Sequence, residues 1–250
     1  TVVDASTVLV TVAYVNSEVG TVRPVRALAK RVRALAPGAR IHLDAAQAPL
    51  WCQCELQALG ADLLSLDAAK CGGLFGAGAL ITRPGVSIAS QLGGGGQEAG
   101  KRAGTENVLG SMSLGLALEV AQADWEERAE QVAKVRDDWW DALQQVLPEA
   151  IINGAGRAAR VANNLNISLP GLDTEYTVVA LDARGIAAST KSACAGAKQG
   201  RSQVGYELTQ DSTRADSTLR FTLGPDTVSE QLAVVTDGLV RHCDQMRAIH

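Results

Sequence analysis

The stretch Ser65-Leu-Asp-Ala-Ala-Lys70-Cys-Gly-Gly73 joins the end of an apolar run to a turn rich in glycine. The run that precedes Lys70, residues 61–66, has the composition of a buried β-strand. The glycines that follow let the backbone turn tightly and approach a ligand. Lys70 therefore follows a strand end, where partial desolvation favours loss of its proton and makes the amine a nucleophile. Because a single lysine is more often an ordinary surface residue, this interpretation depends on the other motifs in the chain.

Two further predicted strands also end in polar residues. Residues 39–43 lead into Asp44-Ala-Ala-Gln47, and residues 8–15 lead into Asn16. Open α/β sheets bind ligands at the carboxyl ends of their strands. A carboxylate such as Asp44 can keep a pyridinium nitrogen protonated, while Gln47 can reach the phenolic oxygen of the same ring. A lysine can form a Schiff base with an aldehyde, so the three strand ends together predict pyridoxal phosphate as the cofactor.

In this order the motifs resemble those of the pyridoxal-phosphate-dependent cysteine desulfurases of the class V aminotransferase group. The resemblance runs through essentially the whole chain. It implies that Lys70 holds the cofactor as a Schiff base, that Asp44 contacts the pyridine nitrogen and that Gln47 contacts the phenolate. It also assigns Asn16 to cofactor and substrate binding. Thr105, after the run Gly93-Gly-Gly-Gly96, matches a residue that reaches the phosphate of the neighbouring subunit in a homodimer.

Two later motifs extend the same resemblance. Ser189-Thr-Lys-Ser-Ala-Cys194 is similar to the loop that carries the family's catalytic cysteine, and Ser217-Thr-Leu-Arg220 is similar to the segment that holds the substrate carboxylate. Small and hydroxyl residues surround Cys194, and two nearby lysines favour its thiolate. The planar guanidinium of Arg220 suits bidentate capture of a carboxylate, although a structural salt bridge would explain it almost as well.

The remaining cysteines have no such pattern. Cys52 and Cys54 are one residue apart, too close for ordinary zinc-ligand spacing, so no metal site is predicted and both are interpreted as reduced thiols. Cys243 is interpreted as a small buried residue on a helix. Five cysteines without a disulfide pattern fit a reducing cytoplasm.

The chain also departs from the resembling family. Asp67 and Ala69 stand where the family carries a serine or threonine that touches the phosphate and a histidine directly before the lysine. Asp67 would repel a phosphate, so its role is open. The family further has an N-terminal part with a glycine-rich turn and a histidine that stacks on the ring. The chain is therefore expected to correspond to the C-terminal two thirds of such an enzyme.

Composition places the chain among globular proteins. It has 250 residues, of which 46% are hydrophobic and 20% charged, and its net charge of -4 gives no electrostatic footprint for nucleic acid. No apolar run has the length of a membrane span, and no signal-peptide pattern is present.

The pattern of apolar residues predicts three regions. Residues 1–108 read as part of a large, mainly parallel α/β domain, with a helix at 24–35. Residues 109–147 read as one or two linking helices, and residues 148–250 as a small α+β domain that carries the cysteine loop. In that domain strands are expected at 163–169 and 185–189, with a helix at 174–184 between them. The fold class predicted is α/β, the fold type I of pyridoxal-phosphate-dependent transferases, with its N-terminal part incomplete.

The function expected from the resemblance is conversion of L-cysteine to L-alanine, with persulfide formation on Cys194. The sulfur would pass to iron-sulfur cluster scaffolds or tRNA-thiolation proteins. Two alternatives stay open: a selenocysteine lyase or other class V carbon-sulfur lyase, and a non-catalytic chain that acts as an assembly partner. The first would differ in substrate preference, and the second in its failure to hold the cofactor.

Overall fold

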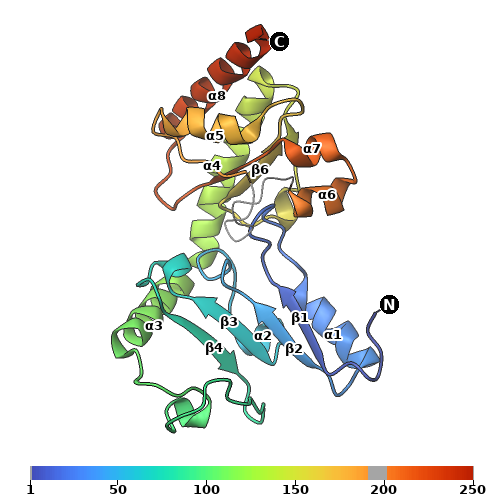
Figure 1. Ribbon diagram of the computed structural model, residues 1–250, viewed down its shortest axis with the longest axis vertical. Helices are drawn as coiled ribbons and strands as arrows, with labels where there is room; N and C mark the ends of the chain where they lie inside the picture. Colours follow the sequence, from blue (N-terminus) through green and yellow to red (C-terminus); the bar gives the residue numbers. More distant parts are fainter. Residues whose placement is uncertain (1, 191–201, 250) are drawn as a thin grey trace. The chain divides into compact units, whose positions relative to one another are not determined.

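The computed structural model describes residues 2–190 and 202–249 (Figure 1). The chain forms two compact units. Unit 1 comprises Thr1–Val15 and Arg23–Trp125, and unit 2 comprises Asn16–Val22 and Glu126–His250. Among the described residues, no helix combines the length and the apolar character needed to cross a membrane.

Unit 1 is built on a four-stranded sheet with the order β1-β2-β3-β4. Strands β1 (Leu9–Ala13), β2 (Arg40–Asp44) and β3 (Leu63–Asp67) are parallel, and β4 (Gly78–Thr82) is antiparallel to β3. Parallel neighbours need crossover connections, which here contain the helices α1 (Val25–Leu35) and α2 (Leu56–Leu59). The mainly parallel α/β architecture and the helix at 24–35 are thereby confirmed.

The two faces of this sheet differ in burial. Ile41, Leu43 and Leu64 are fully buried on one face. His42, Asp44 and Ser65 point to the other face, because side chains alternate along a strand. On that face Nε2 of His42 lies 2.7 Å from Oγ of Ser65. The exposed face is thus the one that carries the polar residues of β2 and β3.

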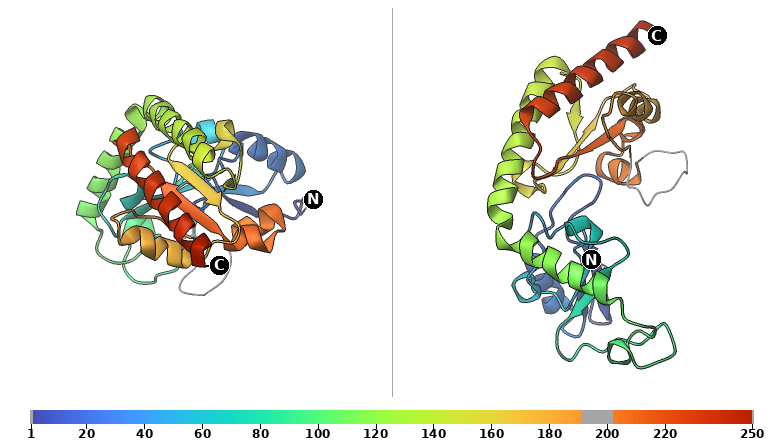
Figure 2. Two further views of the ribbon diagram at one scale, coloured as in Figure 1. Left: turned by 90° about the horizontal axis from the view of Figure 1, so that it is seen from above. Right: turned by 90° about the vertical axis from the view of Figure 1, so that its left-hand side faces the viewer.

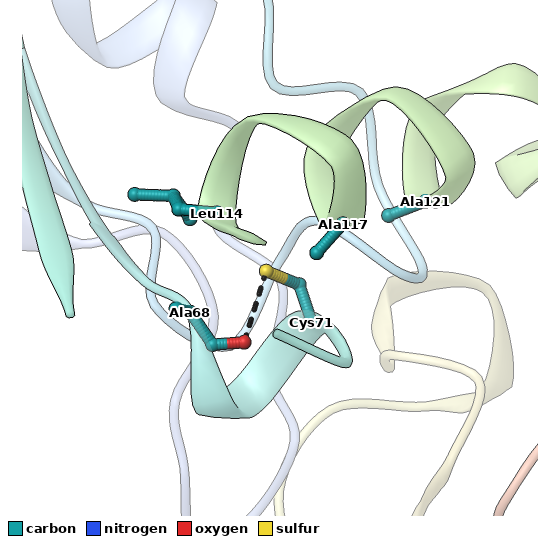
Figure 3. Close-up of a cluster of buried hydrophobic side chains, with 5 residues drawn as sticks. All are labelled: Ala68, Cys71, Leu114, Ala117 and Ala121. Carbon is teal, nitrogen blue, oxygen red and sulfur yellow. Dashed lines mark hydrogen bonds between the residues drawn. The ribbon is translucent and has the colours of Figure 1, made fainter. Parts of the chain in front are cut away.

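Helix α3 (Val108–Ala123) completes unit 1. Its buried side packs Leu114, Ala117 and Ala121 against Ala68 and Cys71, which follow β3 (Figure 3). Helix α4 (Trp125–Val146) follows after one residue, so the region predicted to hold one or two helices holds two. The two compact units divide between Trp125 and Glu126, inside the region predicted from the sequence as linking helices.

Unit 2 is an α+β structure on a three-stranded antiparallel sheet with the order β5-β6-β7. The strands are β5 (Ile151–Ile152), β6 (Asn164–Ser168) and β7 (Thr218–Thr222). The helices after α4 are α5 (Thr174–Asp182), α6 (Gln203–Thr209), α7 (Ser212–Asp216) and α8 (Ser229–Ile249). Helices α4 and α8 lie side by side (Figure 2), and the indole N–H of Trp139 donates to Oγ1 of Thr236 at 2.9 Å. Trp139 also meets Phe221 of β7 edge to face at 5.3 Å.

One predicted strand in unit 2 is wrong. Residues 185–189 form no strand, because only Ser189 pairs with β7, through an isolated bridge to Arg220. Gly185 takes a left-handed φ of 75° directly after α5 and turns the chain there. The strand predicted at 163–169 and the helix predicted at 174–184 are present as β6 and α5.

Candidate functional site

The carboxyl ends of the parallel strands in unit 1 place Asp44 at the edge of the sheet. Asp44 is level with Ala13 of β1 and with Ser65 of β3 in the strand register. Its side chain is exposed, and its Oδ1 accepts a hydrogen bond from the backbone N–H of Ala46 at 3.1 Å. Among the described residues this is the only hydrogen bond of the carboxylate, so Oδ2 is available to a ligand. Gln47 lies in the same turn and is partly exposed.

Lys70 follows the neighbouring strand end. Asp67 is the last residue of β3, and its Oδ1 accepts a hydrogen bond from the backbone N–H of Ala69 at 3.0 Å. Its Oδ2 lies 3.6 Å from Nζ of Lys70, and the two side chains are 39% and 43% exposed. Asp67, whose role the sequence left open, therefore closes the turn that begins the short 3₁₀ helix Ala69–Cys71 and pairs with the lysine.

Cys71 anchors this turn in the core of unit 1. Its Sγ donates to the carbonyl oxygen of Ala68 at 3.4 Å (Figure 3), and burial raises the pKa of the thiol. Gly72 then adopts a φ of 93°, a left-handed conformation in which an L side chain would be strained. Lys70 is thus held at the surface by a buried neighbour and a glycine turn.

Thr105 lies in the irregular segment between β4 and α3. The segment is exposed, contains the short 3₁₀ helix Glu98–Gly100, and ends where the side chain of Asn107 caps α3 by accepting from Gly110 N at 3.0 Å. Oε1 of Gln97 accepts from the backbone N–H of Gly104 at 3.3 Å, which links two positions in the second half of this segment. Thr105 itself is exposed.

The other two candidate residues belong to unit 2. Oδ1 of Asn16 accepts hydrogen bonds from the backbone N–H groups of Glu18 and Val19, each at 2.9 Å, so this oxygen shapes the turn. The guanidinium of Arg220, on β7, donates through Nη1 to the carbonyl oxygen of Ser17 at 2.9 Å. The structure therefore brings the Asn16 turn and Arg220 together through Ser17, a residue that the sequence did not single out.

Arg220 is half-buried, and burial lowers its pKa, while the charge of Glu18 acts in the opposite direction. Glu18 is itself only 4% exposed. Sequence reasoning missed this residue. The available signal was a carboxylate inside the otherwise small and apolar run Glu18-Val-Gly20, directly after a predicted strand.

Cys194, the predicted nucleophile, lies outside the described residues. The residues on either side of that segment are held in unit 2. The hydroxyl of Thr218 donates to the carbonyl oxygen of Thr190 at 2.8 Å, and the hydroxyl of Ser202 donates to Oε1 of Glu18.

The cysteines of unit 1 are protonated thiols at neutral pH. Burial raises the pKa of both Cys52 and Cys54 to about 12, far above the usual value for a thiol. Within residues 2–190 and 202–249, no group of three His, Cys, Asp or Glu side chains is arranged to hold a metal ion. Cys243 is buried on α8, as expected for a thiol with a packing role.

Comparison with known proteins identifies the family. The model of the family described as "Aminotransferase class-V" matches residues 1–235. The chain belongs to the aminotransferase class-V family. Among its curated relatives, the cysteine desulfurase IscS of Dictyoglomus turgidum is 34% identical over 243 residues, which are 97% of this chain and 61% of that protein. IscS of Methanosarcina thermophila is 39% identical over 190 residues, 75% of this chain and 46% of that protein.

A solved structure described as a NifS-like protein matches this class-V chain with a TM-score of 0.87 and 27% identity, over 97% of this chain and 63% of that one. The fold is therefore the α/β fold type I of pyridoxal-phosphate-dependent enzymes, as predicted. The chain spans about three fifths of the length of the first curated relatives it matches, 61% and 60%.

Pyridoxal phosphate is the cofactor of the class-V family. The donor set of unit 1 fits its ring and aldehyde: Asp44 offers a free carboxylate oxygen on the exposed sheet face, and Lys70 offers a half-exposed primary amine after the adjacent strand. Both oxygens of Asp67 are engaged, one by the turn and the other by Lys70.

Proposed function

We propose that this class-V chain carries out cysteine desulfuration, in which L-cysteine is converted to L-alanine and its sulfur passes to Cys194. The observation that carries the proposal is the placement of Asp44 and Lys70 after adjacent parallel strands. The chain resembles proteins named cysteine desulfurases over nearly its whole length. A carboxylate and an amine in that arrangement suit a pyridine nitrogen and an aldehyde.

The sulfur transfer balances without an outside oxidant. The thiolate of Cys194 attacks the sulfur of the substrate, an S–S bond forms, and the bond between that sulfur and the substrate Cβ breaks. The electron pair of the broken bond takes up a proton at Cβ, which leaves L-alanine and a persulfide on Cys194. Bound pyridoxal phosphate supplies the electron sink that makes the bonds at the substrate carbons labile.

The other residues bind and move protons. Lys70 would hold the aldehyde of the cofactor and would move a proton at the substrate Cα. Asp44 keeps the ring nitrogen protonated, and Gln47 contacts the phenolic oxygen. Asn16 and Arg220 orient the substrate, with Arg220 binding its carboxylate through the guanidinium N–H groups that Ser17 does not use.

The proposal also covers the oligomeric state, the sulfur acceptors and the location of the protein in the cell. Two copies would form a homodimer in which Thr105 of one subunit reaches the phosphate bound by the other. The persulfide would be delivered to iron-sulfur scaffold proteins or tRNA-thiolation proteins. Location in the cytoplasm stays a prediction from the sequence.

The test compares the chain with its Cys194→Ser variant. Serine keeps nearly the volume of cysteine but has a hydroxyl that is not appreciably ionised at neutral pH. We expect both proteins to show the visible absorption of bound cofactor, and only the unsubstituted chain to release L-alanine from L-cysteine and to acquire a persulfide. Cys54→Ser and Cys243→Ser are the matched controls and should keep both activities.

Three results would redirect the proposal. Alanine release that survives Cys194→Ser but is lost in Cys54→Ser would move the nucleophile. A strong preference for selenocysteine in a substrate panel would indicate a selenocysteine lyase. A chain without the cofactor absorption would support the non-catalytic assembly partner instead.

A further inference from the structure

Glu18 is a buried carboxylate that the proposed mechanism does not use. It lies in the turn Asn16–Val22 that packs in unit 2. Its carbonyl oxygen accepts hydrogen bonds from Nδ2 of Asn164 and Nδ2 of Asn166, each at 3.1 Å. Its N–H donates to Oδ1 of Asn16 at 2.9 Å. The backbone of Glu18 is therefore fixed independently of its side chain.

The carboxylate of Glu18 has a neutral partner. Oε1 accepts from the hydroxyl of Ser202, which in turn accepts from the backbone N–H of Gly205 at 2.7 Å and begins α6. Among the described residues, Ser202 is the only donor to this carboxylate, and no basic side chain forms an ion pair with it. Burial of an ion with so few partners is unfavourable unless an opposite charge acts on it from nearby.

The guanidinium of Arg220 is held one residue away from Glu18 in the chain. Its Nη1 donates to the carbonyl of Ser17, the residue directly before Glu18, and the charge of Glu18 acts on the guanidinium. Hydrogen bonds to backbone groups hold the turn on either side of Ser17. These include Gly20 N to Asn16 O at 3.0 Å and Nη1 of Arg160 to Val19 O at 2.9 Å. None of these contacts involves the carboxylate of Glu18, so orientation of Arg220 does not depend on it.

We propose that Glu18 sets the affinity of Arg220 for the substrate carboxylate, by offsetting part of the positive charge that the guanidinium presents. This inference rests on the proposed role of Arg220 in substrate binding. The buried charge of Glu18 weakens the electrostatic attraction of Arg220 for any α-carboxylate, including that of the product L-alanine. Ser17 meanwhile keeps the guanidinium in place. A site that must release an amino acid after each turnover gains from such a limit on its affinity.

The test is the Glu18→Gln variant, whose amide keeps an oxygen that can accept from Ser202 but carries no charge. We propose calorimetric titration of the cofactor-loaded chain with L-alanine and with L-alaninamide. The amine of each ligand contributes equally in the two proteins, so the change in the ratio of the two dissociation constants between E18Q and the unsubstituted chain isolates the contribution of the carboxylate. In E18Q we expect the preference for L-alanine over the amide to rise about five- to tenfold, as removal of one buried negative charge at moderate distance implies.

Two controls separate charge from packing. Glu207→Gln removes a charge from the exposed surface of α6 and should leave the ratio within about twofold, because water screens that site. Glu18→Asp keeps the charge, so its ratio of the two dissociation constants should lie within about twofold of the ratio in the unsubstituted chain. A raised preference for L-alanine in E18D, which keeps the charge, overturns the proposal.

The outcomes also distinguish this inference from the proposed function. Turnover of L-cysteine together with an unchanged or lowered ratio in E18Q overturns the role of Glu18 only. A raised ratio in E18Q without any turnover in the unsubstituted chain supports the role of Glu18 and removes the desulfurase proposal. An unsubstituted chain that binds alanine and its amide equally removes the carboxylate site and this inference with it.

Discussion

Lys70 and Cys71 are adjacent residues with opposite surroundings. Cys71 packs against Leu114 and Ala117 of α3, whereas the side chain of Lys70 is 43% exposed beside Asp67. A single turn of 3₁₀ helix produces this difference, since it points neighbouring side chains in different directions. Cys71 fixes the turn in the core, and the amine of Lys70 is accessible to a ligand.

Lys70→Ala should abolish the borohydride-reducible link between the chain and pyridoxal phosphate, because no other described lysine directly follows a strand of the parallel sheet. The link is measured by mass spectrometry after reduction. Lys134→Ala is the control, since Lys134 is 76% exposed on α4 and pairs with Asp138. A reducible adduct that persists in Lys70→Ala would show that the lysine is wrongly assigned.

His242 makes the stability of unit 2 depend on pH. Burial lowers the pKa of His242, with a further lowering by Arg184 and an opposing effect of Asp173. The unfolded chain, with an ordinary histidine pKa of about 6.5, then takes up this proton first as the pH falls. The contribution of His242 to stability is therefore complete above about pH 6.5 and is lost below it.

The pH dependence is checked by urea unfolding of the chain and of His242→Gln at pH 7.5 and 5.5, followed by tryptophan fluorescence. Between these values the variant should lose less free energy of unfolding than the unsubstituted chain. At pH 7.5 the variant should be less stable by about 1 kcal/mol, from loss of the contact between Nε2 and the Thr177 hydroxyl. An equal loss of unfolding free energy in both proteins would contradict the assignment of this pH dependence to His242.

At the scale of elements, the turn Asn16–Val22 joins unit 2 through a close fit against β6. Gly20 has a φ of 70°, and a Cβ built on it would lie 2.6 Å from Oδ1 of Asn164. Gly185 has a similar φ of 75° but open space around it. The two glycines form a matched pair in which only one has a steric neighbour.

Gly20→Ala should therefore destabilise unit 2 by more than Gly185→Ala. The left-handed conformation alone costs about 1–2 kcal/mol at each site, and overpacking against Asn164 adds roughly 1–3 kcal/mol at Gly20. The measurement is the free energy of unfolding in urea. Equal losses in the two variants would mean that the turn is not held against β6.

The same elements show what the sequence could predict. Strands β1, β2 and β3 were predicted because each is a short apolar run bounded by polar or glycine-rich residues. Residues 185–189 have the same local character but pair at Ser189 alone, and local pattern does not reveal whether a partner strand is in reach.

The same difference between local pattern and distant contacts holds for the residues of the candidate site. Asp44, Lys70 and Arg220 were found as chemical groups that follow or lie on predicted strands. Glu18 and Ser17 were missed because they contact Ser202 and Arg220, about 180 to 200 residues away in the chain. The carboxylate of Glu18 stands out in its local sequence, but that sequence does not show which distant residue it contacts.

At the scale of the whole molecule, helix α3 is apolar on both sides. Its inner side packs in unit 1, while Leu109, Met112, Leu116 and Val120 are each more than 60% exposed on the opposite side. Four large apolar side chains in one stripe of a helix indicate a surface that is covered by another protein surface. The homodimer proposed on the basis of Thr105 offers such a cover, since Thr105 lies three residues before the start of this helix at Val108.

We therefore expect the chain to be a homodimer at micromolar concentration and the double variant Met112→Lys, Leu116→Lys to be largely monomeric. Two lysines on each copy place four charges in an interface that is otherwise apolar, and their desolvation is unfavourable. Light scattering measures the mass. The matched control is Val234→Lys, an equally exposed apolar position on α8, at 60%, which should leave the dimer intact. The dimeric and monomeric proteins should also differ in cofactor retention after gel filtration, because in the proposed homodimer Thr105 reaches the phosphate across the interface. An unsubstituted chain that is a monomer and still retains the cofactor would refute the shared site, and the exposed stripe of α3 would then need another partner.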